Sequence, residues 1–471
     1  MTASSQFCFG IEQEHPPISI LNDGTPRPTN NIEAYYGLRD AIKKSGIPHL
    51  FDRRGMFIPY GRFYLEGVGN HVETAVIPCE NPDHAVKNEA KFTRVLQDAI
   101  ISTRAQFPGL NLLRNNIDYI TGSTWASHES YAIDRPPEYL KNALLPFLIT
   151  RQVFSGSATI MGGGMRLSPR ALFMNVSSGG GTTHKRAIYS LSRDEPLMDG
   201  SAFTHRLHLI LGDGLMSQFG QWLKLGTTAL VIRLAENNPD IGEAVKFHQP
   251  VSAIKSLSVL TPQKASLFNA KLLRVQKHYL YAVSRMLEKG FLPEWCEDVV
   301  QAWSEVLSTL EQDPMALCDR LDPYIKLRLY DEYLRSQKLT WSDVTSFSNI
   351  YFQLAMLDVR YHALVDGVFE ELDSSGALNH RRYDDEEVRP GSEAEPFIPE
   401  SLPREVLRAR IIKTHSGREG YSCRWTEIVD ENIRRMITMN DPFSSDCCWT
   451  HYDSRNPFDD EFIRFRDLYL E

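Results

Sequence analysis

Four of the glutamate residues have the clearest potential for chemistry. Glu12 and Glu14 lie two positions apart in FGIEQE, and because successive side chains of a strand point to opposite faces, they share one face. Glu66 and Glu73 follow in RFYLE and HVETAV. Carboxylates crowded on one face repel one another unless a cation neutralises them, and Mg²⁺ takes one or two carboxylates together with substrate phosphates. The spacing indicates a magnesium site, although separately solvated glutamates would show the same spacing.

Basic side chains accompany these carboxylates on predicted strands. Arg62 alternates with apolar neighbours in a strand that ends at Glu66, so both side chains face one side. Arg206 and His208 alternate with leucines in a strand expected over residues 205–213. Because guanidinium groups bind phosphate oxygens through paired hydrogen bonds, these strands could present phosphate ligands beside metal ligands.

Other candidate motifs fit structural roles better. The glycine runs Gly162–Gly164 and Gly179–Gly181 match neither a P-loop nor a dinucleotide fingerprint, so we interpret them as turns. His71 and the pair His128 and Glu129 lack the i, i+4 histidine spacing of helical zinc sites, which favours a structural role. The sequence contains no G-x-S-x-G elbow, so nothing supports hydrolysis by an activated serine.

The cysteines favour reduced, structural thiols. Their number, seven, is odd, and no two of them form a C-x-x-C pair of the kind that holds zinc. Cys447 and Cys448 are adjacent and would point in opposite directions in an extended chain. A small disulfide scaffold is excluded by the length of 471 residues.

Composition and charge exclude several classes of protein. The formal net charge of −9 argues against the broad cationic surface of duplex nucleic-acid binders, and 42% hydrophobic residues argue against a mostly disordered chain. No apolar run reaches the roughly 18 residues that a membrane-spanning helix needs. The N-terminal residues lack the basic stretch and the apolar stretch of a secretory signal peptide. We therefore expect a cytoplasmic protein that binds neither nucleic acid nor membrane.

The hydrophobic pattern predicts an α+β fold. Strands are expected over Phe7–Glu14, Arg62–Glu66 and His205–Asp213, and their one-sided alternation favours antiparallel pairing. Apolar residues at three- and four-residue spacing predict helices that cover the apolar side of the sheet. These helices are expected over Asp83–Gln106, Pro137–Val153, Ala265–Glu288, Asp298–Glu311 and Pro323–Gln337.

A polar segment divides the chain into a large and a small domain. Residues 370–402 are rich in charge, Gly, Ser and Pro, which is typical of a linker or mobile loop. We predict a domain over residues 1–385 and a small α+β domain over residues 386–471.

Several motifs, in order and in register, resemble the Pup ligase and depupylase family. They are GIEQE, RFYLE, RNNID, SHESY, PFLITRQVFSG, LSPRA, SRDEP, RLHLILGD followed by KLGTTALV, DPYIKLRLYDEYL, Trp425 and NDPF, and together they cover nearly the whole chain up to Phe443. The 54 positions between Glu12 and Glu66 match the short spacing of the ligases, since depupylases carry an extra loop before the catalytic strand. NDPF near the C-terminus also resembles the ligase.

The resemblance implies a fold and a reaction. The family is similar to glutamine synthetase and the carboxylate-amine ligases, in which a curved antiparallel sheet backed by helices forms an ATP cradle beside a small C-terminal domain. ATP and Mg²⁺ would phosphorylate the γ-carboxylate of the C-terminal Glu of Pup, a small disordered modifier, or of a Pup-like modifier ending in Glu or Gln. A protein lysine would then attack the acyl phosphate, giving an isopeptide bond.

The resemblance also assigns roles to single residues. Glu66 matches the proton acceptor, a general base that a lysine of reference pKa about 10.4 requires at neutral pH. The metal ligands would be Glu12, Glu14, Tyr64, Glu73 and His208. The nucleotide contacts would be Arg62, Val76, Trp425, Arg193 and Arg206, with the tryptophan as a stacking surface for adenine.

The catalytic segment departs from the family pattern. Glu66 replaces an aspartate, one extra residue separates it from Glu73, Val76 replaces a hydroxyl residue and Pro78 replaces an acid. Ligation is the leading hypothesis. The alternatives are hydrolysis of the isopeptide bond or deamidation of a modifier, phosphoryl transfer to another acceptor, and a nucleotide-binding pseudoenzyme.

Overall fold

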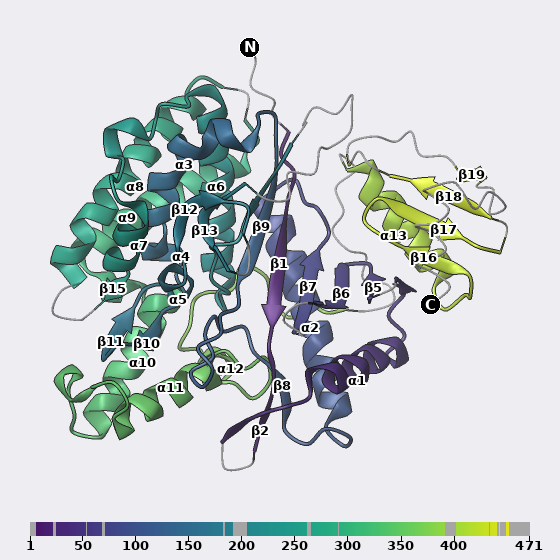
Figure 1. The fold of residues 1–471 in the computed structure, drawn as a ribbon, viewed down its shortest axis with the longest axis horizontal. Helices are drawn as coiled ribbons and strands as arrows, with labels where there is room; N and C mark the ends of the chain where they lie inside the picture. The colour runs from purple at the N-terminus through teal and green to yellow at the C-terminus, as the bar shows by residue number, and fades with distance from the viewer. Residues whose placement is uncertain are drawn as a thin grey trace.

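An eleven-stranded β-sheet runs across the computed structural model (Figure 1). The structure describes residues 6–21, 25–52, 54–67, 71–181, 184–191, 205–260, 265–290, 292–390, 402–432, 434–439, 442 and 449–451. In spatial order the strands are β14 (His205–Leu209), β9 (Ser127–Ile133), β1 (Phe9–His15), β7 (Val72–Val76), β6 (Gly61–Leu65), β5 (Gly55–Ile58), β4 (Leu50–Phe51), β16 (Tyr421–Cys423), β17 (Glu427–Asp430), β18 (Arg435–Thr438) and β19 (Trp449–His451). All neighbours pair antiparallel except β4 and β16, so the predicted antiparallel α+β fold is confirmed.

Three smaller sheets complete the strand inventory of the described residues. They are β3 (Pro26–Pro28), β2 (Pro17–Ile20) and β8 (Leu110–Leu112); β10 (Thr159–Met161), β11 (Gly164–Arg166) and β15 (Val259–Leu260); and the parallel pair β12 (Val176–Gly179) and β13 (Ala187–Ser190). The run Gly162–Gly164 makes the turn between β10 and β11, with positive φ at Gly162 and Gly163, as predicted.

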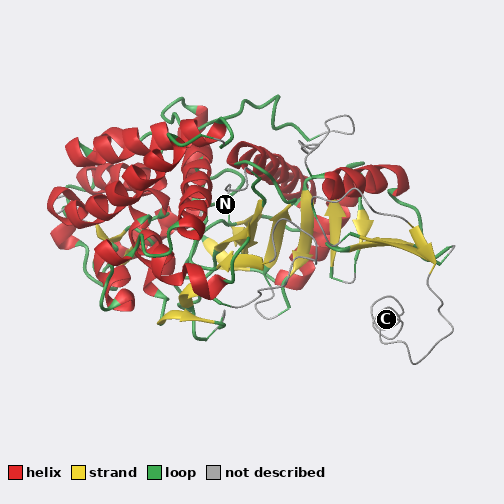
Figure 2. Ribbon diagram, turned by 90° about the horizontal axis from the view of Figure 1, so that it is seen from above, coloured by secondary structure: helices red, strands yellow, loops and turns green. Residues whose placement is uncertain are grey.

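Helices gather behind one face of the sheet and at its β14 end (Figures 1 and 2). They are α1 (Asn31–Lys44), α2 (Pro82–Thr103), α3 (Pro137–Thr150), α4 (Gln152–Ser155), α5 (Pro169–Leu172), α6 (Gln218–Asn237), α7 (Pro250–Leu257), α8 (Ala265–Leu287), α9 (Trp295–Gln312), α10 (Asp322–Ser336), α11 (Asn349–Tyr361), α12 (Val368–Ser374) and α13 (Pro403–His415). The five predicted helices correspond to α2, α3 with α4, α8, α9 and α10. Among these described helices, none combines the length and the apolar composition that crossing a bilayer demands.

Local signals explain where two of the long helices, α2 and α6, begin. The side chain of Asn81 accepts a hydrogen bond from the backbone N–H of His84 at 2.8 Å, and Pro82 occupies the first turn of α2. Ser217 caps α6 by accepting from Gly220 N–H at 2.9 Å. α6 is apolar nearly all round and buried, which is why its sequence shows no amphipathic stripe and we did not predict it.

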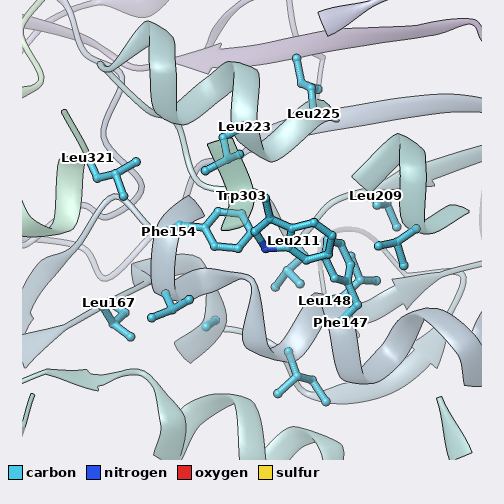
Figure 3. Close-up of a cluster of buried hydrophobic side chains, with 14 of the residues drawn as sticks. Phe147, Leu148, Phe154, Leu167, Leu209, Leu211, Leu223, Leu225, Trp303 and Leu321 are labelled. Carbon is cyan, nitrogen blue, oxygen red and sulfur yellow. The ribbon is translucent and has the colours of Figure 1, made fainter. Parts of the chain in front are cut away.

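A large hydrophobic core lies between the helices and the sheet (Figure 3). Trp303 of α9 is fully buried, and its ring lies 6.0 Å from that of Phe147 and 6.5 Å from that of Phe154, both edge-on. Ile11 of β1 and Leu207 of β14 point into this core. One face of the central strands is therefore fixed by helix packing, and the other face remains for polar side chains.

The C-terminal region extends the main sheet. The short strands β4 and β16 pair in parallel with Phe51 opposite Ser422, and Leu50 and Phe57 of the large domain share a hydrophobic cluster with Ile412 of α13. The predicted small α+β unit thus contains a helix and strands, but its strands continue the sheet of the large domain.

The polar segment predicted as a linker is partly docked. Arg382 donates to Asp83 Oδ1 at 2.7 Å and lies 3.8 Å from the Trp222 ring, while the Tyr383 hydroxyl donates to the Asp83 carbonyl at 2.7 Å. The part of this segment around Arg382 and Tyr383 is therefore docked against α2 and α6. Residues 391–401, Arg193, Phe443, Cys447 and Cys448 lie outside the described residues, as does the rest of the unmatched tail apart from 449–451.

A buried ion pair holds the back of the sheet. Glu129 of β9, on the face opposite His128, accepts two hydrogen bonds from Arg151, at 2.6 and 2.8 Å, and both side chains are almost completely buried. This placement confirms the structural role predicted for Glu129.

We expect Glu129→Ala to lower the free energy of unfolding by about 3–5 kcal/mol, because it leaves the buried Arg151 charge without its partner. Urea denaturation would measure the change. Glu311→Ala, which removes the exposed partner of Lys277, is the matched control and should cost less than about 1 kcal/mol. Equal losses in the two variants would contradict the role of burial.

Candidate active site

The register of the central strands gathers the predicted carboxylates on one face. Glu12 of β1 lies opposite Ala75 of β7, and Glu14 lies opposite Glu73. On the next strand pair, Tyr64 of β6 is opposite Glu73. Directly opposed residues share a face, so the three glutamates and the tyrosine converge as the alternation predicted.

The neighbouring strands β9 and β14 add further polar side chains to this face. His128 of β9 lies opposite Glu12, and His208 of β14 lies opposite Ser130. The Arg206 guanidinium donates to Ser130 Oγ at 3.0 Å and lies 3.1 Å from His208 Nδ1. We call the face formed by β14, β9, β1, β7 and β6 the cradle face.

One candidate metal-binding group consists of Glu14, His71 and Glu73. His71 Nε2 lies 2.8 Å from Glu73 Oε1 and 3.8 Å from Glu14 Oε1. All three residues are buried, and each can direct one ligand atom toward a common point. His71 precedes β7 and points to the cradle face because it is two positions before Glu73.

A second group consists of Glu12, His128 and His208. His128 Nδ1 lies 3.1 Å from Glu12 Oε2, while its Nε2 lies 3.3 Å from Glu14 Oε1, so this imidazole bridges the two groups. The His128 and His208 rings meet edge-on at 5.1 Å. The Tyr64 hydroxyl donates a hydrogen bond to Glu12.

The carboxylates respond differently to their surroundings. Burial opposes ionisation of Glu12, but the hydrogen bond from His128 and the nearby imidazoles outweigh it and hold the Glu12 pKa well below its ordinary value. Burial raises the pKa of Glu73, and the negative charges of Glu12 and Glu14 add to this rise against the hydrogen bond from His71. Glu12 therefore favours its charged form, whereas the crowding of carboxylates opposes the charge of Glu73.

The imidazoles are shifted toward their protonated forms. Burial lowers the pKa of His71, but the hydrogen bond to Glu73 and the charges of Glu14 and Glu73 raise it more. For His128, burial is likewise outweighed by the hydrogen bond to Glu12 and the charges of Glu12 and Glu14, so the pKa rises. A proton on either ring places positive charge beside the carboxylates, as a bound divalent cation would.

The donor set fits Mg²⁺. Three carboxylates lie together on the cradle face, and each of them can offer an oxygen ligand. Glu12, Glu14 and Glu73 are the residues that would hold the ion, with Tyr64 and His208 at its edge. Oxygen ligands of this kind suit a hard cation that also binds phosphate.

Arginines border the carboxylates on both sides. Arg62 of β6 lies on the cradle face opposite Ala75, and its Nε donates to Asp52 Oδ2 at 2.7 Å. On the other side, Arg170 is buried and lies close enough to Glu14 for their charges to interact, as does Arg186. Burial, as the largest cause, lowers the pKa of Arg170 to about 10.

Glu66, the predicted base, lies at the end of β6. Its backbone N–H donates to the His71 carbonyl at 3.0 Å, which ties the end of β6 to the start of β7. Its side chain is half-buried and acts on the charge of His71. The predicted base therefore lies beside the carboxylate cluster and within reach of solvent.

The two predicted nucleotide contacts at the edges of this region differ in position. The Trp425 ring meets Phe57 edge-on at 5.0 Å and lies at the junction with the C-terminal strands. The Val76 side chain, by contrast, points into the helical core, because it alternates with Ala75. Only the backbone of Val76 remains available, as its replacement of a hydroxyl residue implied. Its contact with a nucleotide stays a prediction.

Sequence reasoning missed several residues of the cradle face. We assigned His71 and His128 structural roles, but both contact the predicted metal ligands. A period of two would have found them, since His71 lies two positions before Glu73 and His128 alternates with Glu129. Ser130 lies two positions after His128 and would have been found in the same way. No alternation in the sequence around Asp52 indicated its contact with Arg62.

Comparison with known proteins identifies sequence relatives across most of the chain. A family model described as Pup-ligase protein matches residues 27–429. The Pup–protein ligase of Micrococcus luteus is 28% identical over 468 residues, covering 93% of this chain and 95% of the relative. A Pup deamidase/depupylase of Mycobacterium tuberculosis is 32% identical over 367 residues, covering 72% of this chain and 70% of the relative.

Two solved structures share the fold. The ligase PafA in complex with the prokaryotic ubiquitin-like protein Pup aligns with a TM-score of 0.76 at 23% identity, covering 100% of this chain and 94% of the other. PafA in complex with ADP aligns with a TM-score of 0.69 at 24% identity, covering 88% and 91%. The fold predicted from resemblance is thus confirmed.

We expect Mg²⁺ to raise the unfolding temperature more at pH 8.5 than at pH 6.5. His71 and His128 have raised pKa values in the folded protein, so their contribution to stability is fully present below about pH 6.5 and is lost as pH rises through the folded values. Without these protons the carboxylates repel one another, and Mg²⁺ relieves that repulsion. Differential scanning calorimetry, with and without Mg²⁺, would measure the difference.

The exposed His248 provides the control, since His248→Gln should leave the pH dependence unchanged. His71→Gln should reduce it. A stabilisation by Mg²⁺ that is the same at both pH values in the wild type would contradict competition between protons and the ion.

Proposed function

This chain belongs to the Pup-ligase family, and from that premise we propose that it joins Pup or a Pup-like modifier to protein lysines at the expense of ATP. The reaction activates the γ-carboxylate of the modifier's C-terminal Glu as an acyl phosphate, and a lysine then forms the isopeptide bond. We expect it to take place in the cytoplasm, where ATP and protein lysines are available.

The main support for this proposal is that Glu12, Glu14 and Glu73 lie together with arginines on both sides of them. Phosphoryl transfer brings the γ-phosphate of ATP and the accepting carboxylate together, and both are anions. When bound, Mg²⁺ supplies positive charge between them. A face that combines carboxylates with flanking guanidinium groups suits two anionic substrates that must meet.

In the first step the flanking side chains orient the two substrates. Arg62 and Trp425 lie on one side of the carboxylates, which suits the phosphates and the adenine of ATP. Arg170, Arg186 and Arg206 lie on the other side, where the modifier carboxylate approaches. A γ-carboxylate oxygen attacks the γ-phosphorus, the bond to the β-phosphate oxygen breaks, and ADP leaves.

In the second step Glu66 acts as the proton acceptor. The lysine Nζ must be neutral to attack the acyl carbon, and Glu66 takes its proton while inorganic phosphate leaves. The position of Glu66 between the carboxylate cluster and solvent allows a lysine to enter from outside. Its extra methylene, relative to aspartate, extends the carboxylate farther from β6.

We expect Glu66→Gln to lower conjugation by about 10²–10⁴-fold, because the amide keeps the size of the side chain but cannot accept the proton. The assay combines the protein, ATP, Mg²⁺, a disordered modifier that ends in Glu and a lysine-bearing protein. Mass spectrometry would detect the isopeptide. Glu371→Gln, at an exposed position of α12, is the control and should conjugate at the wild-type rate.

The products separate the competing functions. Cleavage of a preformed conjugate without ligation would indicate a hydrolase, and a phosphorylated protein without isopeptide would indicate a phosphotransferase. Nucleotide binding without ADP formation would indicate a pseudoenzyme. Each of these results would contradict the proposed ligase.

A further inference from the structure

We propose that Asp52 is a positioning residue for nucleotide binding: it holds the Arg62 guanidinium toward the ATP phosphates and away from Glu12. This inference rests on the proposed function, since it assumes that Arg62 binds the nucleotide. Asp52 follows β4, two strands away from β6 in the sheet, and therefore approaches Arg62 from the side opposite to the carboxylate cluster.

The Asp52 carboxylate is fixed by its own turn. Its Oδ1 accepts a hydrogen bond from the Arg54 backbone N–H at 2.8 Å, and its backbone N–H donates to the Gly55 carbonyl at 3.0 Å. The side chain is only 6% exposed. One oxygen thus anchors the carboxylate, and the other, Oδ2, is presented to Arg62.

Two contacts orient the Arg62 guanidinium. Asp52 Oδ2 accepts from Nε at 2.7 Å, along one edge of the group, and the guanidinium carbon lies over the Tyr64 ring, 4.3 Å from its centroid. The two terminal nitrogens make no hydrogen bond within the described part of the chain. An edge contact and a face contact together fix the plane, which leaves both terminal nitrogens for paired hydrogen bonds to phosphate.

Without Asp52, a competing ion pair is available to Arg62. Arg62 and Glu12 both lie opposite Ala75, so they belong to one cross-strand row with a single strand between them. Two strand spacings separate their backbones by about 10 Å, and the small Ala75 leaves the space between them for long side chains. An unrestrained Arg62 would bind Glu12 and occupy a ligand of the metal.

The location of Asp52 also links the two domains. Phe51, the preceding residue, pairs with Ser422 of β16. The Phe57 ring is near both nucleotide contacts, 5.8 Å from the Arg62 guanidinium carbon and 5.0 Å from the Trp425 ring. The phosphate contact and the adenine contact are therefore held at the same junction. A shift of Arg62 would misalign the phosphates relative to the base.

The test is the affinity for ADP, measured by isothermal titration calorimetry with Mg²⁺ and with EDTA. We expect Asp52→Asn to weaken binding about tenfold with Mg²⁺ and less with EDTA, because released Arg62 competes with the ion for Glu12. The asparagine can still accept from Arg54, so the turn is kept. Asp385→Asn, which removes an exposed partner of Arg94 and Arg381, is the control and should bind as the wild type does.

A double-mutant cycle separates positioning from a general structural effect. In an Arg62→Ala background, Asp52→Asn should change the affinity by less than twofold, because its effect passes through Arg62. Asp52→Glu, which keeps the charge, should recover part of the affinity. It also serves as the second variant if the asparagine variant does not fold.

Wild-type affinity in both Asp52 variants, or an equal loss with and without Arg62, would overturn the positioning role while the proposed ligase stands. Failure of the wild-type protein to bind ADP at all would overturn both.

Discussion

Repulsion among Glu12, Glu14 and Glu73 is the constraint on which the rest of this structure depends. The register of the antiparallel strands β1 and β7 brings these carboxylates together, and their side chains are largely buried, so water screens their repulsion poorly. His71, His128 and the nearby Arg170 offset part of this repulsion, and a bound cation would reduce it further. A face on which buried carboxylates repel one another favours binding of a metal ion, and a bound metal ion attracts anionic substrates. Binding of the substrate with its metal therefore lowers the electrostatic repulsion that the folded protein already carries.

The opposite face of the same strands keeps this arrangement in place. Ile11 and Leu207 fill the helical core, and the buried pair of Glu129 and Arg151 holds β9 from behind. The two faces of β9 differ in the partners of their polar side chains. Glu129 is satisfied by a paired guanidinium and is structural, whereas its neighbour His128 contacts two carboxylates and belongs to the candidate site. Adjacent residues of β9 therefore have different roles, because their side chains point to opposite faces of the sheet.

The sequence predicted much of this fold and part of the site. Alternation of apolar residues identified the strands of Glu12, Glu66 and His208, and helical periodicity identified α2 and α8 to α10, because both patterns follow from which side of an element is buried. The fully buried α6 lacks such a contrast and escaped prediction. The docked segment around Arg382 also escaped it, because charged residues that bind partners on α2 and α6 have the same composition as a free linker.

By itself the sequence determined the family and the α+β class and supplied the candidate residues for binding metal and phosphate, since these depend on residue type, order and local periodicity. Only the tertiary structure decided which of them meet. The bridging of Glu12 and Glu14 by His128, the restraint of Arg62 by Asp52 and the extension of the sheet through β4 and β16 all join segments far apart in the chain. Such contacts are set by strand register and packing, and a change of register by one residue would turn every cradle-face side chain into the core.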